Sequence, residues 1–403
     1  MLFMSMKRIL IMSGLAFLLW AMPTAIFAAT YTVNTTDNSD DGTCDVVHCS
    51  LMEAINAAAT HAGPHTIAFS IPLSDPGYNA GGWWTIRPTR GLSIPTDTIL
   101  DGTTQTAQRG DTNPNGPEIA IDGSALPAGV TLMRVGNTGT VRGLVINNAP
   151  AYHIWVEGAN IVIAGNYIGT DPTGKEVSST PSTYAYDKIL IIRAQNSRIG
   201  GPDPSDANII ASAGNCIRIA NAMGTKVVGN FIGTDASGTR ALGCQVGVEI
   251  HGDAHNNTLG PDNVIAFNRF YGVQVREAGT LSNTITANHI YSNTLGGIDL
   301  LSGGNGELAG PFISKASGSE VVGTACANCR IEIFSDEEHE GRVYEGFVMA
   351  NSSGDFAFSK LGGLTGPYVT ATTTDGDGNT SEFSKRQRVV SGRIYLPLLY
   401  KNP

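Results

Sequence analysis

Six short stretches of this 403-residue chain alternate apolar and polar residues. They are HIWVE from 153, KILII from 188, CIRIA from 216, GVEIH from 247, GVQVR from 272 and GIDLL from 297. Side chains of a β-strand alternate between its two faces, so this pattern predicts one buried and one outward face. The outward set includes carboxylate, imidazole, guanidinium and indole groups, which can bind sugar hydroxyls or transfer protons. The candidate binding residues are Trp155, Arg218, Glu249, His251, Gln274, Arg276 and Asp299.

These side chains share one surface if the six stretches stack as neighbouring strands. With strands about 4.8 Å apart, the charged and amide members form one exposed patch roughly 15 Å long, with Trp155 at its far end. An elongated face of this kind suits a polymeric glycan. The alternative is an ordinary solvated face, in which Glu249 pairs with Arg218 or Arg276 across the strands.

Catalysis by the same surface would need charged groups placed about one bond of the substrate. Glu249 and Asp299 hold equivalent positions two strands apart, so strand spacing puts them about 9–10 Å from each other. That separation is at the upper edge for an inverting glycosidase. Alternatively, His251 or Arg276 abstracts a proton beside a uronate, as β-elimination requires. If the protein is an enzyme, the candidate catalytic residues are Glu249, His251, Arg276 and Asp299.

Motifs that would make an enzymatic function specific are missing from the sequence. We find no paired-Asp or Gly-His-Gly motif of polygalacturonase-like enzymes, no acidic cluster of the pectate lyase type and no phosphate-binding glycine loop. Nucleotides are therefore not expected partners. The preferred function is binding of extracellular polysaccharide or matrix. A polysaccharide lyase or glycoside hydrolase is the alternative, and a structural spacer is the third.

A repeat positions these residues. The first apolar residues of the six stretches follow one another at intervals of 25 to 35 residues. Short strands with tight corners at this period are typical of a parallel β-helix, whose stacked coils bury a common core. Asparagines at the corners can tolerate left-handed backbone and can form hydrogen-bonded ladders of their amides from coil to coil. They are Asn147, Asn166, Asn230, Asn268 and Asn288.

One loop occurs twice, as GNYIGTDPTG from 165 and GNFIGTDASG from 229. Gly-Thr-Asp-x-x-Gly predicts a turn whose backbone is capped by Asp171 or Asp235. The coils that carry it are the longer ones, so we expect the two loops to project as side walls. Calcium ligation by the same aspartates is the alternative, and no neighbouring carboxylate cluster favours it.

The N-terminal region predicts an end cap for the coils. Ser50 and Glu53 form the capping box S-x-x-E, and Leu51, Ile55 and Ala58 share one helical face. A helix near residues 51–60 would cover the open first coil, whose strand edges and core side chains have no neighbour.

Several motifs resemble one family. CSLMEAINAA from 49 resembles the Cys-Ser-Leu-Arg-Glu-Ala signature of secreted bacterial right-handed parallel β-helix proteins, with Met52 in place of Arg. LDGTTQ from 100, VRGLVINN from 141, GNYIGTD from 165 and GIDL from 297 resemble the same family. The resemblance covers residues 30–310. It implies a pectin-lyase-like fold at an extracellular or cell-surface location, and it supplies no catalytic residues.

The pattern changes after the β-helix region. Residues 311–390 contain closely spaced alternating strands, which predict a small antiparallel β-sandwich resembling the Ig-like modules that accompany such β-helices. TDGDGNTSEF from 374 half-matches a calcium loop, but Thr380 stands where that loop needs Gly, so a hairpin turn is preferred. Residues 391–403 resemble the Tyr-Leu-Pro-Leu tails of secreted proteins of some filamentous bacteria. Cell-envelope attachment and a packed terminal strand are the alternatives for this tail.

The first 29 residues have the layout of a secretory signal peptide. Lys7 and Arg8 precede an apolar run that is shorter than the ~20 residues needed to span a bilayer. A retained membrane anchor is the alternative. Without these two cations, 23 basic residues face 35 acidic ones, a net charge of −12, so nucleic acid is not an expected partner.

The cysteines support the same extracellular setting. There are six, an even number, which in a secreted chain favours disulfides. Their spacing suggests the pairs Cys44–Cys49, Cys326–Cys329 and, with less support, Cys216–Cys244. Zinc at the C-A-N-C stretch would need two more ligands that no second motif offers. We therefore predict no metal site and no cofactor.

Overall fold

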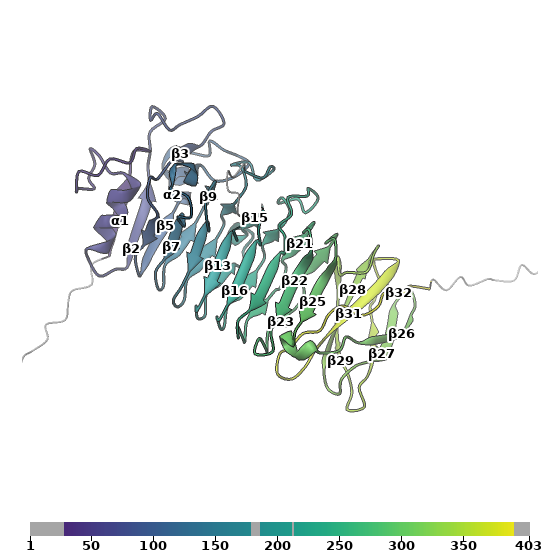
Figure 1. Ribbon diagram of the computed structural model, residues 1–403. Coiled ribbons are helices and arrows are strands. Elements are labelled where there is room, and N and C mark those ends of the chain that lie inside the picture. The colour runs from purple at the N-terminus through teal and green to yellow at the C-terminus, as the bar shows by residue number, and fades with distance from the viewer. Residues whose placement is uncertain (1–27, 179–185, 212, 391–403) are drawn as a thin grey trace, which may run out of the picture.

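The computed structural model describes residues 28–178, 186–211 and 213–390. It is an all-β parallel β-helix followed by a small antiparallel sandwich, which confirms the predicted fold class (Figure 1). Three parallel sheets run along the helix, with nine strands in sheet 1 and eight each in sheets 2 and 3. No helix among the described residues combines the length and apolar character needed to cross a membrane.

The strands of each sheet follow one another in chain order, one from each coil. Sheet 1 contains β1 (Ala29–Val33), β2 (His65–Phe69), β5 (Thr98–Asp101), β8 (Thr140–Arg142), β11 (Val162–Ala164), β14 (Arg198–Gly200), β17 (Lys226–Val228), β20 (Thr258–Leu259) and β23 (Thr284–Ile285). Sheet 2 contains β4 (Leu92–Ile94), β7 (Met133–Val135), β10 (Ile154–Val156), β13 (Ile189–Ile192), β16 (Ile217–Ala220), β19 (Val248–His251), β22 (Tyr271–Arg276) and β25 (Gly296–Leu301). Sheet 3 contains β3 (Trp84–Ile86), β6 (Ile119–Asp122), β9 (Leu144–Asn147), β12 (Tyr167–Ile168), β15 (Ile209–Ile210), β18 (Phe231–Ile232), β21 (Val264–Ala266) and β24 (His289–Tyr291).

The six predicted strands are the last six of sheet 2. Their first apolar residues are consecutive register partners and are buried in one continuous core. Burying each of these aliphatic side chains contributes about 1.5–3 kcal/mol, so the core holds the coils in a single register. The sequence analysis did not predict β4 and β7, nor the short helix α2 (Thr103–Arg109).

Buried asparagines link the coils. Asn166, Asn208, Asn230, Asn263 and Asn288 form a ladder in which each amide nitrogen donates to the next amide oxygen, at 2.8–3.2 Å. A second ladder has a single step, in which the Asn268 amide nitrogen donates to Asn293 Oδ1. The Asn147 amide nitrogen instead donates to the backbone carbonyl of Thr170. None of the five asparagines named in the sequence analysis has left-handed backbone. The asparagines that do are Asn148, Asn160, Asn196, Asn221, Asn256, Asn305 and Asn328 among the described residues.

The repeated loop has a structural explanation. Asp171 Oδ1 accepts the backbone N–H groups of Lys175 and Glu176, both at 3.0 Å. Asp235 Oδ1 caps the second copy in the same way. Arg240 of the second copy forms an ion pair with Glu176 of the first. This ion pair therefore links the two loops beside sheet 3.

The first coil is covered by α1 (Leu51–Ala59), at the purple end of Figure 1. Ser50 accepts the N–H of Glu53, and the Glu53 carboxylate accepts the N–H of Ser50, so the predicted capping box is present. The apolar face of the helix joins the coil core, packing against β1, β2 and β4. The loop that precedes the helix is closed by the disulfide Cys44–Cys49.

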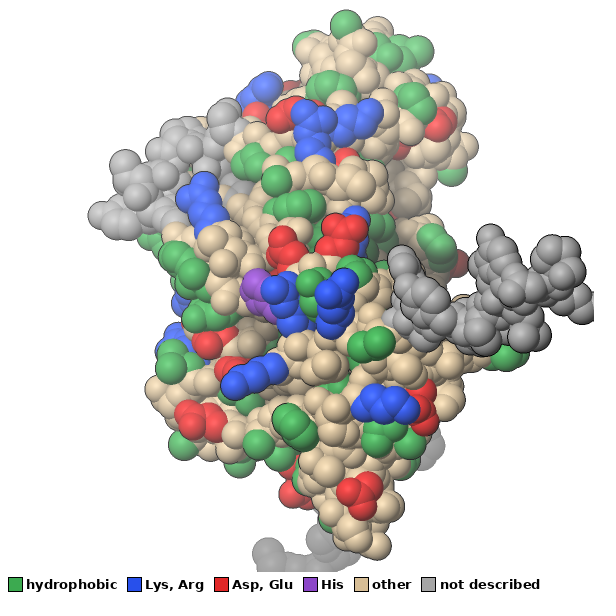
Figure 2. Space-filling view, turned by 90° about the vertical axis from the view of Figure 1, so that its right-hand side faces the viewer, with side chains coloured by type: hydrophobic (Ala, Val, Ile, Leu, Met, Phe, Trp, Pro, Cys, Tyr) green, Lys and Arg blue, Asp and Glu red, His purple; other side chains and the backbone are tan. Residues whose placement is uncertain are grey.

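The sandwich covers the opposite end. Its sheets are β26 (Phe312–Ala316), β27 (Glu320–Thr324) and β30 (Asp355–Ser359), and β29 (Val343–Met349), β28 (Arg330–Asp336), β31 (Tyr368–Thr374) and β32 (Gln387–Arg388). They enclose an apolar core of their own. Figure 2 faces this end of the molecule, and the acidic, basic and apolar side chains of its described part are interspersed.

Each of the three last strands of the coils finds a partner in the sandwich. The N–H of Ile285 in β23 donates to Thr380 Oγ1 at 3.0 Å. Ile290 in β24 exchanges two backbone hydrogen bonds with Gly341. The N–H of Leu300 in β25 donates to Glu382 Oε1 at 3.0 Å.

Two buried glutamates extend this junction. Glu332 Oε2 accepts the N–H of Ala287 at 2.9 Å, and Glu340 Oε2 accepts the N–H of Asn293 at 3.1 Å. The sandwich therefore satisfies backbone donors that a further coil would otherwise satisfy.

Because Glu340 is buried, we predict that the free energy of unfolding falls as pH rises. Burial raises the pKa of its carboxyl to about 7, and its Oε1 is buried without a hydrogen-bond partner among the described residues. Because the pKa is higher in the folded than in the unfolded chain, the stabilising contribution is full below the ordinary value and is lost as pH rises through about 7. At about 1.4 kcal/mol per pKa unit, the loss is roughly 3 kcal/mol at most.

Urea unfolding at pH 5 and pH 8 measures this effect. Glu340→Gln keeps an acceptor for Asn293 and should reduce the difference in unfolding free energy between the two pH values. Glu337→Gln, an exposed neighbour, should leave the difference unchanged. An undiminished difference in Glu340→Gln would contradict the assignment.

Candidate functional site

The outward positions of sheet 2 form one continuous column. Trp155, Leu190, Arg218, Glu249, Gln274 and Asp299 are successive register partners. The column continues N-terminally through Arg134 and Ser93. A second outward position brings His251 next to Ala220 and Arg276 next to Leu301. All the sequence-predicted binding residues therefore lie on one face of the sheet.

Glu249 is the centre of the charged part of this column. Its Oε2 accepts the Asn215 amide at 2.8 Å and lies 3.0 Å from Arg218 Nε. Its Oε1 accepts Arg276 Nε at 2.8 Å. These three groups leave Glu249 only 7% exposed. The expectation of a wholly exposed patch was therefore wrong at its centre, because polar side chains from neighbouring coils cover the carboxylate.

Asp187 is a second carboxylate of the site, one that the sequence analysis missed. Its Oδ2 lies 3.1 Å from the same Arg218 Nε, and it is 2% exposed. Burial raises the pKa of its carboxyl to about 6; the Glu249 charge adds to the rise and Arg218 opposes it. Asp187 lies two residues before β13, outside the alternating stretch.

The buried polar group continues beside Asp187. Burial lowers the pKa of the Lys188 ammonium to about 8. One coil earlier, His153 is fully buried, and neither ring nitrogen has a hydrogen-bond partner among the described residues. Burial, with the Lys188 charge, lowers the pKa of His153 well below its ordinary value. A neutral His153 imidazole avoids the cost of burying a charge at this position.

Arg276 and His251 lie on the C-terminal side of Glu249. Arg276 Nη1 donates to Glu277 Oε1 at 2.7 Å, in addition to its bond with Glu249. His251 Nδ1 lies 3.8 Å from the same Glu277 oxygen. Burial lowers the pKa of His251, and the Arg276 and Arg218 charges lower it further against the opposing Glu249 charge. Of the two proposed proton acceptors, neutral His251 is therefore the better suited.

Asp299 lies two coils from Glu249, as the sequence predicted, but Gln274 lies between them in the column. Gln274 Nε2 donates to Asp299 Oδ2 at 2.8 Å. This bond holds Asp299 in a separate amide–carboxylate pair. Asp187, and not Asp299, shares a partner with Glu249.

The aromatic end of the column is partly occupied by protein groups. The Arg134 guanidinium lies 4.2 Å from the centre of the Trp155 ring. Tyr152 meets Trp155 edge-on, with ring centres 5.4 Å apart, and contacts Tyr186 in the same manner. Buried Leu190 separates Trp155 from the charged part. Arg134 therefore covers one face of the indole, and the indole Nε1 donates to Glu157 Oε2 at 3.1 Å.

The cysteines lie outside this surface chemistry. Cys44–Cys49, Cys216–Cys244 and Cys326–Cys329 are disulfides, the pairs that their spacing suggested. The second one joins the approach to β16 to the coil that leads to β19. It tethers the two coils that carry Arg218 and Glu249.

Comparisons with known proteins give weak structural likenesses. The enzymatically active domain of tailspike protein 2 from bacteriophage CBA120 matches at TM-score 0.31 and 9% identity, over 80% of this chain and 71% of that one. Full-length tailspike protein 2 from the Escherichia coli O157:H7 bacteriophage matches at TM-score 0.27 and 8% identity, over 83% of this chain and 60% of that one. ORF18 of Geobacillus virus E2 matches at TM-score 0.26 and 11% identity, over 89% of this chain and 76% of that one. Neither a family model nor a curated protein matches the chain.

Because Asp187 and Glu249 share Arg218, we predict that removing Arg218 and removing Glu249 shift the Asp187 pKa in opposite directions. Arg218→Gln removes a charge that lowers the Asp187 pKa, so the pKa should rise above about 6. Glu249→Gln removes a charge that raises it, so the pKa should fall. Carboxyl-carbon NMR titration measures both, with Arg198→Gln on sheet 1 as a control that should change nothing. Shifts of equal sign in the two variants would contradict the geometry.

Proposed function

We propose that the protein binds a neutral extracellular polysaccharide along the outer face of sheet 2. Pairing of Glu249 with one arginine is what an ordinary solvated face predicts; the observation that carries this proposal is that Arg218 and Arg276 both converge on a Glu249 carboxylate that is only 7% exposed. The two arginine side chains keep 32% and 31% of their surface exposed. Their remaining N–H groups are held in place before a ligand arrives, which lowers the entropy cost of binding hydroxyl groups.

The charge balance favours a neutral ligand. Near Arg218 and Arg276 lie the carboxyl groups of Asp187, Glu249 and Glu277, so both guanidinium charges are already compensated. Asp299 adds a further carboxyl group on the same face. A polyanion would meet a surface with no surplus positive charge, on a chain that is acidic overall.

The shape of the surface favours a polymer. Equivalent outward positions repeat from coil to coil at the strand spacing of about 4.8 Å. A ligand with a repeating backbone can therefore meet the aromatic cluster at Trp155, the charged centre and the Gln274–Asp299 pair in succession. A small ligand would use one of these groups alone.

The proposal includes an extracellular location. It is supported by the disulfides and by the leader-like sequence of residues 1–29, most of which lies outside the described residues. Resemblance of CSLMEAINAA to the secreted β-helix signature supports membership of that family. We also propose that residues 30–310 and 311–390 are separate domains, the second Ig-like. The proposed envelope-attaching tail, 391–403, lies outside the described residues.

Polysaccharide hydrolysis is a second candidate, favoured by Asp187 specifically. Asp187 and Glu249 approach the same Arg218 Nε at 3.1 and 3.0 Å, so these two oxygens are at most about 6 Å apart, close to the separations of glycosidase carboxylates. An Asp187 pKa of about 6 suits a general acid near neutral pH. The low exposure of both carboxylates ranks this candidate below binding.

A glycan array followed by titration with the best ligand tests the proposed binding. Arg276→Gln should weaken binding about tenfold, because it removes a charged hydrogen-bond donor worth roughly 1.5 kcal/mol. Arg198→Gln is the matched control: it lies on sheet 1, forms one ion pair and is 33% exposed. Equal affinity of wild type and Arg276→Gln for every bound glycan would overturn the proposed site.

The same mixtures of protein and bound glycan test whether the protein hydrolyses the polysaccharide. Hydrolysis would release new reducing ends from the bound glycan, and Asp187→Asn should then cut the rate by about 10²–10⁴ while binding survives. Binding without release of reducing ends rejects hydrolysis. Turnover that persists in Asp187→Asn rejects the assigned carboxylate.

A further inference from the structure

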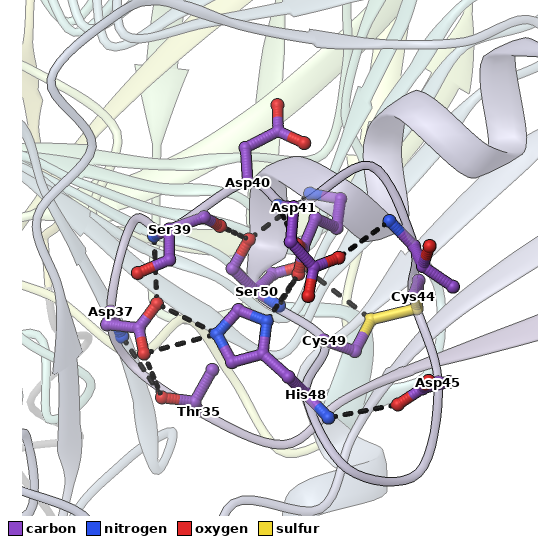
Figure 3. Close-up of polar contacts among 12 residues, drawn as sticks. Thr35, Asp37, Ser39, Asp40, Asp41, Cys44, Asp45, His48, Cys49 and Ser50 are labelled. Atoms are coloured by element: carbon purple, nitrogen blue, oxygen red, sulfur yellow. Dashed lines mark hydrogen bonds and ion pairs between the residues drawn. A yellow bond between two sulfur atoms is a disulfide. The ribbon is translucent and has the colours of Figure 1, made fainter.

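Three potential metal ligands meet at the N-terminal end, around the start of α1. One ligand atom each from Asp41, His48 and Glu53 lies within 4.8 Å of the other two. Figure 3 shows the imidazole of His48 between Asp37 and the start of α1. Asp41 and His48 lie on the loop that is closed near its end by Cys44–Cys49, and Glu53 is the third residue of α1.

The His48 ring is oriented by a carboxylate on its other side. Its Nε2 lies 3.2 and 3.3 Å from the two Asp37 oxygens. Its Nδ1 is buried and lies 3.0 Å from Glu53 Oε2, yet it makes no aligned hydrogen bond. Metal-bound histidines typically have this arrangement, in which a carboxylate holds one ring nitrogen and directs the other toward the ion.

Glu53 contributes a rigid, buried carboxylate. It is 2% exposed, Oε1 accepts the N–H of Asp41 at 2.7 Å, and Oε2 accepts the N–H of Ser50 at 2.7 Å. A carboxylate oxygen has room for more than one partner, so both oxygens can still bind an ion. Asp37, Asp41 and Glu53 together place three carboxyl groups around one imidazole. A divalent cation would balance this local charge.

We propose that Asp41, His48 and Glu53 bind one divalent transition-metal ion of the zinc class, with Asp37 as the positioning residue. One imidazole nitrogen and two carboxylate oxygens are a donor set that zinc accepts, with water as a fourth ligand. Calcium fits less well because it prefers oxygen ligands alone.

The geometry needs only a small adjustment. With metal–ligand distances of about 2.0–2.2 Å, tetrahedral ligand atoms lie about 3.4 Å from one another. His48 and Glu53, at 3.0 Å, are already close to this separation. Asp41 is the exposed member, so its side chain can rotate inward. The ion would tie the disulfide loop to the helix that covers the first coil.

The competing explanation is a protonated His48 that simply pairs with Asp37 and Glu53. Calorimetric titration of tag-free, chelator-treated protein with zinc chloride separates the two. We expect one saturable site per chain and a higher melting temperature with zinc. Cobalt(II), used as a second probe, should give the visible absorption of a four-coordinate site.

Zinc binding by single-residue variants tests each proposed metal ligand. His48→Ala should abolish binding, and Asp41→Asn, which keeps the backbone N–H to Glu53, should weaken it at least tenfold. Asp37→Asn should weaken it about tenfold as well, the usual effect of removing a carboxylate that orients a ligand. The matched control is Asp40→Asn, an adjacent residue on the same loop that pairs with Arg90. It should bind zinc as wild type does.

Two results would overturn the proposal. One is the absence of saturable zinc binding to the folded wild-type protein, which leaves the ion pair as the explanation. The other is wild-type zinc affinity in Asp41→Asn. If His48→Ala proves unfolded by circular dichroism, Asp41→Asn and Asp40→Asn carry the test.

Discussion

A stack of parallel coils has two ends, and at each end a layer of backbone donors and acceptors has no neighbouring coil. Every other feature of this molecule depends on covering them, because exposed parallel edges pair with other chains and exposed coil cores admit water. The N-terminal end uses α1, whose first turn is held by buried Glu53. The C-terminal end uses the sandwich, whose Glu332, Glu340 and Glu382 accept backbone N–H groups of the last coil. At the C-terminal end, glutamate carboxylates thus stand where a further strand would have placed carbonyls, whereas Glu53 at the N-terminal end caps the covering helix itself.

Closed ends allow the interior coils to keep one register, and the register creates the site. The apolar partners from Ile154 to Ile298 face inward, so their neighbours must line up outside. Buried asparagine ladders and Cys216–Cys244 reinforce the same alignment. Arg218, Glu249 and Arg276 then come together from three consecutive coils without any loop to position them. A polar cluster built on sheet in this way is pre-organised, which is the property that the proposed binding requires.

The part of the site that follows strand alternation could be predicted from the sequence. The outward column from Trp155 to Asp299 needed only a period of two within strands and one strand per coil. Asp187, Asn215 and His153 could not be found this way, because they precede their strands, where alternation does not hold. The burial of Glu249 also escaped prediction, since it depends on how long arginine side chains from other coils fold over it. The end caps likewise arise from contacts between distant segments: Glu332 lies 45 residues from the N–H that it accepts.

Hydrogen–deuterium exchange of the intact protein tests most directly whether the sandwich closes the coil stack. The amides of Ala287, Asn293 and Leu300 donate to Glu332, Glu340 and Glu382. If these carboxylates complete the last coil, the three amides should exchange as slowly as those of interior strands such as β16 and β19. Exchange as fast as that of the exposed loop residue Val46 would show that the last coil is open and would contradict the account.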